Sequence, residues 1–288
     1  MPLEGLEPPT YRLQIDCTTN CATAAFEDIL QTIMTLVKKI LSVFNIISNC
    51  NFMKSTLELS ENEESMMIAE SHPWFMDLAA WVLPLLTAVS FREAIKTHAC
   101  HYRGDTIAKM VGLGSFSLTK NLDPFGSALG PLVLIIRQKG LVYGWAKGTE
   151  IRPDFLNKGR WDAAFIILIA LLSNYIMAAG WACFGKLGLL FNDTFPRISE
   201  FMLLMGKNGV EINLLLMIVH LIPVPPMDIS YLVRSYLPQV IRMAYTPFDY
   251  VGQYLIYVVI FLKAAQPQLG IIMGHLQTHL FDTLGFSL

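Results

Sequence analysis

Long runs of apolar residues alternate with shorter polar stretches over most of the chain. Four of these runs are near or above the roughly 20 residues that a membrane-spanning helix requires, and they cover approximately 76–102, 125–142, 161–191 and 201–233. A fifth run, at 250–264, is shorter. The pattern predicts an all-α, multi-pass integral membrane protein whose main partner is the lipid bilayer.

The two ends of the chain have a different pattern. Residues 1–27 lack periodicity, and we expect them to be unstructured or to lie before the true start of translation. In 28–50, apolar residues recur at helical spacing around Lys38 and Lys39, which favours an amphipathic helix in the membrane interface. Residues 51–75 are expected to form an acidic linker, 76–264 the membrane core, and 265–288 a C-terminal amphipathic helix.

Composition supports a membrane protein and excludes several other classes. The chain has 288 residues, of which 53% are hydrophobic and 15% charged, whereas soluble domains have about 25% charged residues. The net charge of −2 provides no basic face, so nucleic-acid binding is not expected. None of the five cysteines forms a CxxC pair. For a bacterial source, the expected location is the inner, or plasma, membrane.

The run at 214–228 ends in a feature that is unusual for a membrane span. Pro223, Pro225 and Pro226 interrupt it, and Asp228 closes it. A carboxylate at the bilayer centre costs about 2.5–3.5 kcal/mol on the mildest scale, so it normally faces a protein interior. Because a proline has no backbone N–H, carbonyl groups near it lose their hydrogen-bond donor. Within the hydrocarbon region of a membrane, such carbonyls are tolerated only inside protein or beside a water-filled cavity. We therefore expect a polar pocket between helices.

Five short motifs follow one another along the chain: Gly104-Asp105-Thr106-Ile107-Ala108-Lys109, Asp123-Pro124-Phe125-Gly126, Tyr143-Gly144-Trp145-Ala146-Lys147, Leu172-Ser173-Asn174 and His220 through Asp228. In order and interval they resemble the motifs of the site-2 protease family of intramembrane zinc metalloproteases, in particular its compact bacterial branch. The resemblance implies a helical membrane core with short re-entrant or β elements between the helices. It also implies a zinc endopeptidase site with Asp228 as a metal ligand and Glu93 as the general base.

The chain departs from this family where the zinc site belongs. The HExxH positions hold Arg92-Glu93-Ala94-Ile95-Lys96, so cations replace both histidine ligands. Neither a guanidinium nor an ammonium can donate to a metal. We therefore expect no cofactor and no proteolysis, which makes the chain a pseudoenzyme whose zinc site is lost.

Other residues of the pattern are kept, and other motifs have changed. The retained residues are the pocket residues Asp123, Asn174, Pro223 and Pro226, together with Trp145 and Lys147. Among the changed positions, the family's Asn is His220 and the Gly after the metal-binding Asp is Ile229.

Alternative metal ligands are few. His98, Cys100 and His101 lie close in sequence to the Arg92 position. At 100° per residue, however, His98 and His101 point away from the helix face that carries Arg92, so these three residues are not expected to form a metal site there. His275 and His279 have the spacing of a zinc helix, but Leu276 stands where the catalytic Glu belongs. His220 together with Asp228 is a better candidate for metal binding, although a weak one.

The charges suggest a replacement for the metal. Lys96 lies only about 40° around the helix from Arg92, so the two cations share a face opposite Asp228 and near Glu93. We predict a buried network in which two cations and two carboxylates balance. The alternative is that Arg92 and Lys96 extend outward toward the interface.

Three functions are compatible with these features. The leading hypothesis is an inactive site-2-protease-like protein that binds transmembrane segments of partner proteins. The second is an active zinc endopeptidase in which Glu93 is the base and Asp228 and a histidine are ligands. The third, a transporter, would explain the intramembrane charges and the broken helix, but the sequence shows no repeat.

Overall fold

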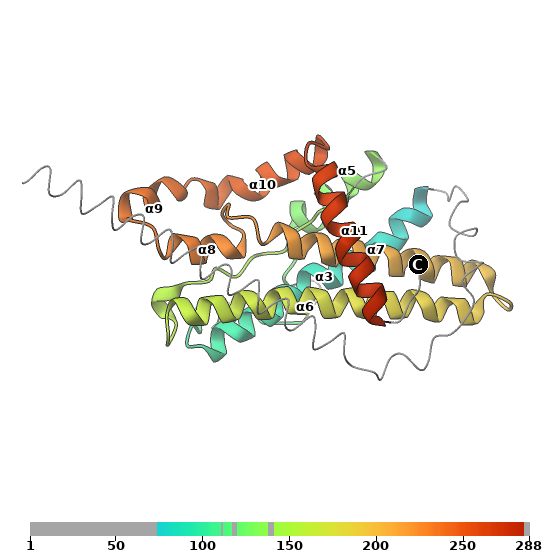
Figure 1. Cartoon of the computed structure of the whole chain (residues 1–288), viewed down its shortest axis with the longest axis horizontal. Helices are drawn as coiled ribbons and strands as arrows, with labels where there is room; N and C mark the ends of the chain where they lie inside the picture. The colour runs from blue at the N-terminus through green and yellow to red at the C-terminus, as the bar shows by residue number, and fades with distance from the viewer. Residues whose placement is uncertain (1–73, 111, 117–119, 138–140, 285–288) are drawn as a thin grey trace, which may run out of the picture.

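The computed structural model describes residues 74–110, 112–116, 120–137 and 141–284, and regular secondary structure there is helical (Figure 1). The elements are α3 (Trp74–Tyr102), α4 (Ile107–Met110), η2 (Pro124–Leu129), α5 (Gly130–Arg137), η3 (Pro153–Phe155), α6 (Arg160–Gly188), η4 (Leu189–Phe191), α7 (Pro196–Val219), α8 (Asp228–Arg234), α9 (Gln239–Tyr245), α10 (Phe248–Phe261) and α11 (Gln266–Leu284). The predicted all-α membrane fold is confirmed. The expectations for 1–27, 28–50 and most of 51–75 lie outside the described residues.

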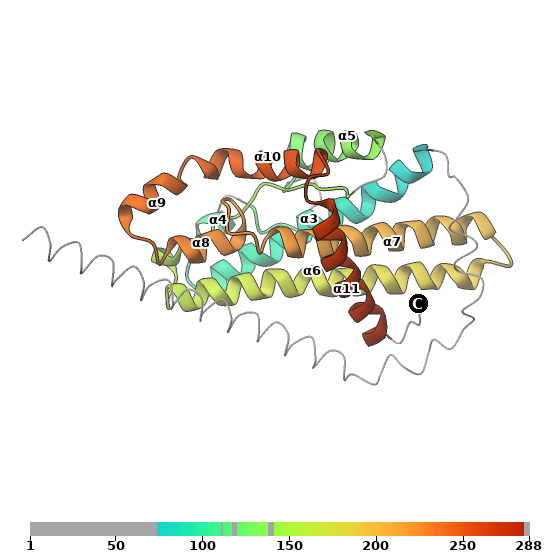
Figure 2. The same cartoon turned by 45° about the horizontal axis from the view of Figure 1, so that its top comes forward.

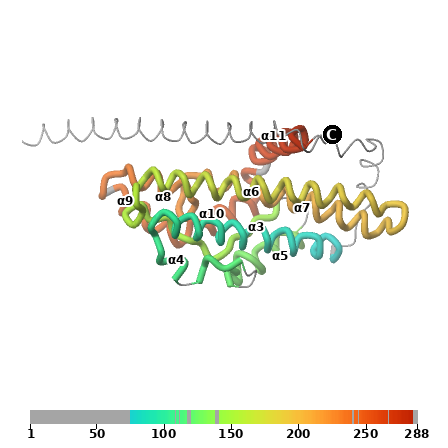
Figure 3. The backbone as a smooth tube through the Cα atoms, turned by 90° about the horizontal axis from the view of Figure 1, so that it is seen from below, coloured from blue at the N-terminus to red at the C-terminus, as the bar shows by residue number. Residues whose placement is uncertain are grey.

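Among the described residues, three helices are long and apolar enough to span a membrane: α3, α6 and α7. The helices α6 and α7 form an antiparallel hairpin, and α3 packs against both (Figures 1 and 2). Figure 3, which views the molecule from below, shows α3 running beside this hairpin with α4 and α5 projecting beyond it.

The prediction of a nearly full-length crossing at 125–142 is wrong. The helical segment there runs from Pro124 to Arg137, through η2 and α5, and is too short to be a candidate span. It starts where Asp123 caps it: one carboxylate oxygen of Asp123 accepts hydrogen bonds from the backbone N–H groups of Phe125 and Gly126. The run therefore belongs to a short helix packed beside the spans.

The apolar run at 201–233 is not one helix. The helix α7 begins earlier, at Pro196, and ends at Val219, and the chain then turns through residues 220–227 before α8 starts at Asp228. The prolines at 223, 225 and 226 explain the interruption, because each lacks the N–H that would continue a helix. The turn redirects the chain so that Asp228 faces the interior, fully buried.

Glycines allow α6 and α7 to approach closely. A Cβ atom placed on Gly206 of α7 would lie 2.6 Å from the Cα atom of Gly185 on α6. Such a distance is far inside van der Waals contact, so this crossing requires glycine. The α6–α7 hairpin thereby gains a tight backbone contact.

The segment at 141–152 leads from the short helices to η3 and contacts α3 without forming a strand. The described residues contain an isolated antiparallel bridge between Leu122 and Ala146, where the family resemblance implied short β elements. The Trp145 N–H donates to the Gly126 carbonyl at 3.0 Å, and the Lys147 N–H donates to the Asn121 carbonyl at 2.8 Å. These bonds fix the segment whose next residues reach the charged site.

A helix, α11, occupies most of the expected C-terminal segment. It crosses α6 and α7 (Figure 1) and buries Leu280 and Leu284 in the core beside α6. The Tyr175 hydroxyl on α6 lies 3.5 Å from His279 Nδ1 and 3.4 Å from the Thr283 hydroxyl. His279 therefore contacts an α6 tyrosine.

Candidate functional site

Helix α3 carries three charged residues into the protein interior. Arg92, Glu93 and Lys96 are only 2%, 5% and 2% exposed. Arg92 and Lys96 are one helical turn apart and so lie on the same face. The alternative in which these cations extend outward is wrong.

Asp228 reaches the same place from a distant part of the sequence. It begins α8, directly after the proline-rich turn, and it is completely buried. A backbone bond from the Ile229 N–H to the His220 carbonyl, at 3.2 Å, closes the turn. The turn thus sets both the depth and the direction of the carboxylate.

The four residues Arg92, Glu93, Lys96 and Asp228 form a continuous ion-pair network, called here the charged cluster. Arg92 pairs with Asp228 through Nη2 and with Glu93 Oε1 through Nη1, the latter at 2.9 Å. Lys96 Nζ lies 2.8 Å from the Glu93 carboxylate and 3.1 Å from Asp228 Oδ1. Each cation contacts both carboxylates, so the predicted network is confirmed.

The charges of the cluster cancel, which matters because an unpaired buried ion costs several kcal/mol. Two cations face two carboxylates, and the backbone N–H of Thr149 also donates to Glu93 Oε2 at 2.8 Å. The Thr149 hydroxyl in turn lies 2.6 Å from that of Thr97, one turn after Glu93. The cluster therefore fastens α8 and the 141–152 segment to α3.

Two further polar side chains lie close to the cluster. His220 Nδ1 is 3.6 Å from Asp228 Oδ2, which is longer than a hydrogen bond, and that nitrogen has no hydrogen-bond partner among the described residues. The Tyr143 hydroxyl is also buried without a partner among them. Burial raises the pKa of Tyr143, so its hydroxyl stays protonated and neutral.

The other predicted pocket residues have separate local roles. Asp123 caps η2, Trp145 belongs to a core cluster, and Lys147 is exposed. Pro223 and Pro226 lie in the turn before Asp228. Asn174, fully buried on α6, has neither amide atom hydrogen-bonded within the described part of the chain.

Within the described residues, the remaining histidines and cysteines do not assemble around the cluster. His98 Nδ1 lies 2.8 Å from the Ala94 carbonyl, and its ring stacks on Phe116. Cys100 is buried in an apolar cluster. Over residues 74–284, excluding the undescribed gaps, no group of three or more His, Cys, Asp and Glu residues could hold a metal ion.

The donor chemistry of the cluster does not fit zinc. Zinc in proteins takes thiolate, imidazole or carboxylate donors, and three protein ligands are needed for a catalytic site. Here Arg92 and Lys96 offer only N–H donors, and they engage oxygens of both Asp228 and Glu93. A metal at this point would have to displace both cations.

Sequence reasoning missed Thr149, Thr97 and Tyr143. Thr149 is 56 residues from Glu93 and binds it through a backbone N–H, which the residue type does not reveal. Thr97 carried a weak signal, because it follows Glu93 by one turn and bonds back to the Glu93 carbonyl at 2.8 Å.

A comparison with known proteins finds similarity to a Bacillus subtilis (strain 168) protein named "Putative zinc metalloprotease YwhC". The two are 24% identical over 184 residues, which cover 63% of this chain and 79% of that protein. No protein-family model matches the chain, and no solved structure matches it. Together with the three candidate spans, the similarity to a protein of that name supports a protease-like membrane protein.

Proposed function

We propose that this chain is an integral membrane protein of the site-2 protease type that no longer hydrolyses peptides and that binds transmembrane segments of partner proteins. The charged cluster is the observation that supports the loss of peptide hydrolysis. Arg92 and Lys96 occupy the positions of the two histidine ligands and pair with Asp228 and Glu93. Glu93, the expected general base, accepts hydrogen bonds from both cations and so lacks the freedom to take a proton from water.

The metal content of three purified variants tests the loss of zinc. We expect no zinc in the wild type and about one zinc per chain in Arg92→His/Lys96→His, because two imidazoles and the Asp228 carboxylate complete a ligand set. Adding Asp228→Ala should remove that zinc. Arg92→Gln/Lys96→Gln is the matched control, since it removes the same charges without supplying ligands.

The opposite result would support the alternative function. About one zinc per wild-type chain, lost with Asp228→Ala, would indicate an active endopeptidase of unusual ligation. His220, whose Nδ1 is 3.6 Å from Asp228 Oδ2, would then be the first ligand to substitute. Cleavage of a membrane substrate that is abolished by a chelator would establish the activity.

Partner binding is supported by the resemblance and is tested by crosslinking. Pro223 is exposed in the turn beside the cluster, whereas Ile198 is exposed near the start of α7, at the other end of that helix. With a photoreactive amino acid at each position, we expect a membrane protein to crosslink from position 223 and not from 198. Equal crosslinking at the two positions, or none at 223, would contradict a specific binding site there.

A further inference from the structure

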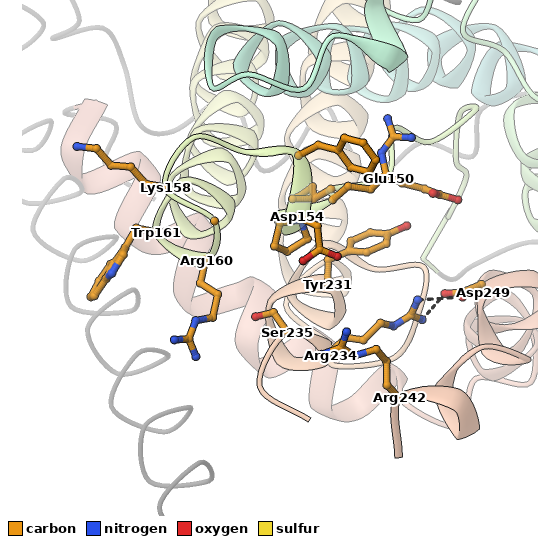
Figure 4. A pocket seen from close by; sticks show the side chains of 15 residues that line it. Glu150, Asp154, Lys158, Arg160, Trp161, Tyr231, Arg234, Ser235, Arg242 and Asp249 are labelled. Atoms are coloured by element: carbon orange, nitrogen blue, oxygen red, sulfur yellow. Dashed lines mark hydrogen bonds and ion pairs between the residues drawn. The ribbon is translucent and has the colours of Figure 1, made fainter. Parts of the chain in front are cut away.

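A cavity distinct from the charged cluster opens at one end of the helices. Its volume is about 600 Å³, within the range of about 300–1,000 Å³ typical of small-ligand sites. Its walls come from the segment at 150–155, the start of α6, and the helices α8 to α10 (Figure 4).

Arginines form one side of this cavity. Arg234 forms a two-pronged pair with Asp249, at 3.0 and 2.5 Å, which holds its guanidinium in a fixed orientation. Arg242 lines the same side (Figure 4) and donates a long hydrogen bond of 3.5 Å to the Leu237 carbonyl. No carboxylate of the described residues lies within ion-pair distance of Arg242. This side therefore presents an uncompensated positive charge.

Carboxylates lie across the cavity. Glu150 and Asp154 both line it and are exposed, and they are drawn on the other side of Tyr231 from the arginines (Figure 4). Neither is ion-paired with a cation in the described part of the chain. Burial, with the negative charge of Glu150 nearby, raises the pKa of Tyr231, so its hydroxyl remains a donor between the two sides.

The cavity lies beside the ends of two candidate membrane spans, α3 and α6. It adjoins Arg160, where the span of α6 begins, and the Asn157 N–H bonds at 2.9 Å to the carbonyl of Arg103, just after the span of α3 ends. Trp161 is 68% exposed and Tyr102 78% exposed at this end. Exposed Trp and Tyr near helix ends are typical of the membrane–water interface.

We propose that this cavity binds a phosphoethanolamine group. The phosphodiester pairs with Arg242, on the side where Arg234 is held by Asp249, and the ammonium pairs with Asp154 and Glu150. Lys158 and Arg160 also line the cavity, and Arg152 there is paired with Asp105. A purely anionic group would still face the carboxylates Glu150 and Asp154, which are unpaired within the described residues, and a purely cationic one would face Arg234 and Arg242. Charges of opposite sign on two walls of one cavity fit a zwitterion.

Native mass spectrometry of the full chain in detergent tests this site by titration with phosphatidylethanolamine and phosphatidylglycerol. We expect phosphatidylethanolamine to bind more tightly. Arg242→Gln should weaken this binding about tenfold, as expected for loss of one charge-assisted contact. Asp154→Asn should weaken phosphatidylethanolamine and not phosphatidylglycerol. Arg197→Gln, an exposed arginine at the opposite end, is the matched control and should have no effect.

Competition by soluble glycerophosphoethanolamine, which keeps the phosphodiester and the ammonium but lacks acyl chains, distinguishes the source of the group. Displacement at concentrations similar to that of the lipid would support the proposal with a free compound of this kind as the natural ligand. Displacement only in large excess would support it with the lipid as the ligand. The proposal is overturned if saturating glycerophosphoethanolamine displaces nothing, if phosphatidylglycerol binds as tightly as phosphatidylethanolamine, or if Arg242→Gln behaves like Arg197→Gln.

Discussion

At the scale of single residues, the charged cluster makes Arg92 a critical side chain for stability. Arg92→Ala leaves Glu93 and Asp228 with Lys96 as their single cation, so one buried carboxylate loses its counter-charge. Breaking a buried ion pair by removing one partner typically costs about 3–5 kcal/mol. We expect a clear decrease in the thermal midpoint of the detergent-purified protein.

A double variant separates charge balance from loss of volume. Arg92→Leu/Asp228→Leu removes one charge of each sign and leaves Lys96 paired with Glu93 at 2.8 Å. It should melt above Arg92→Leu alone, because apolar replacements of a whole buried pair are often tolerated. Wild-type-like melting of Arg92→Ala would show that the cluster contributes little, while Arg197→Ala gives the background for an exposed arginine.

The sequence was sufficient to place these charges together. Helical spacing brings Arg92 and Lys96 to one face, and the cost of a lone carboxylate at depth requires a partner for Asp228. It was not sufficient to find Thr149 or Tyr143, because their contacts depend on how the 141–152 segment crosses α3. Such contacts join positions far apart in the chain, and they cannot be predicted from the local pattern of apolar and polar residues.

At the scale of elements, the glycine crossing makes a second prediction. Gly206→Ala places a methyl group 2.6 Å from the Cα of Gly185, so α6 and α7 must separate. Overpacking of this kind typically costs about 1–3 kcal/mol. Gly180→Ala on α6 is the matched control, since nothing lies within 4 Å of its added Cβ. That variant should be neutral or gain up to about 1 kcal/mol from helix propensity.

Thermal melting of the two glycine variants in the same detergent compares them directly. A lower midpoint for Gly206→Ala, with an unchanged or higher one for Gly180→Ala, is the expected result. If both variants melt alike, the close approach of α6 and α7 is not a source of stability.

Element boundaries show where hydropathy succeeds and where it fails. The cores of α3 and α6 coincide with the apolar runs at 76–102 and 161–191, because length and hydropathy alone define a span. The apolar run at 125–142 was wrongly predicted to be nearly long enough to cross the membrane, because apolar side chains also line short helices that pack against the rest of the protein. The α7–α8 break was recognisable from its prolines, whereas its consequence, a carboxylate aimed at α3, required the fold.

At the scale of the whole molecule, basic residues gather at one end of the spans. Arg103 follows α3, Arg152 and Lys158 precede α6, and Arg234 ends α8. At the opposite end, Lys186 is in the last turn of α6 and Arg197 in the first turn of α7, with Asp193 in the connection between these helices. Since cytoplasmic loops carry the excess of Lys and Arg, we expect the Arg103 end to face the cytoplasm.

Cysteine labelling in a bacterial host tests this orientation. The two reporters are Asp154→Cys at the basic end and Asp193→Cys at the α6–α7 connection, both at exposed positions, in a chain whose five native cysteines are alanine. A membrane-impermeant maleimide should label position 193 in intact cells and position 154 only after lysis. The reverse pattern would place the basic end, and the cavity beside α6, outside. Because one membrane separates the two reporters, each serves as the other's control, and labelling of both in intact cells would contradict α6 as a span.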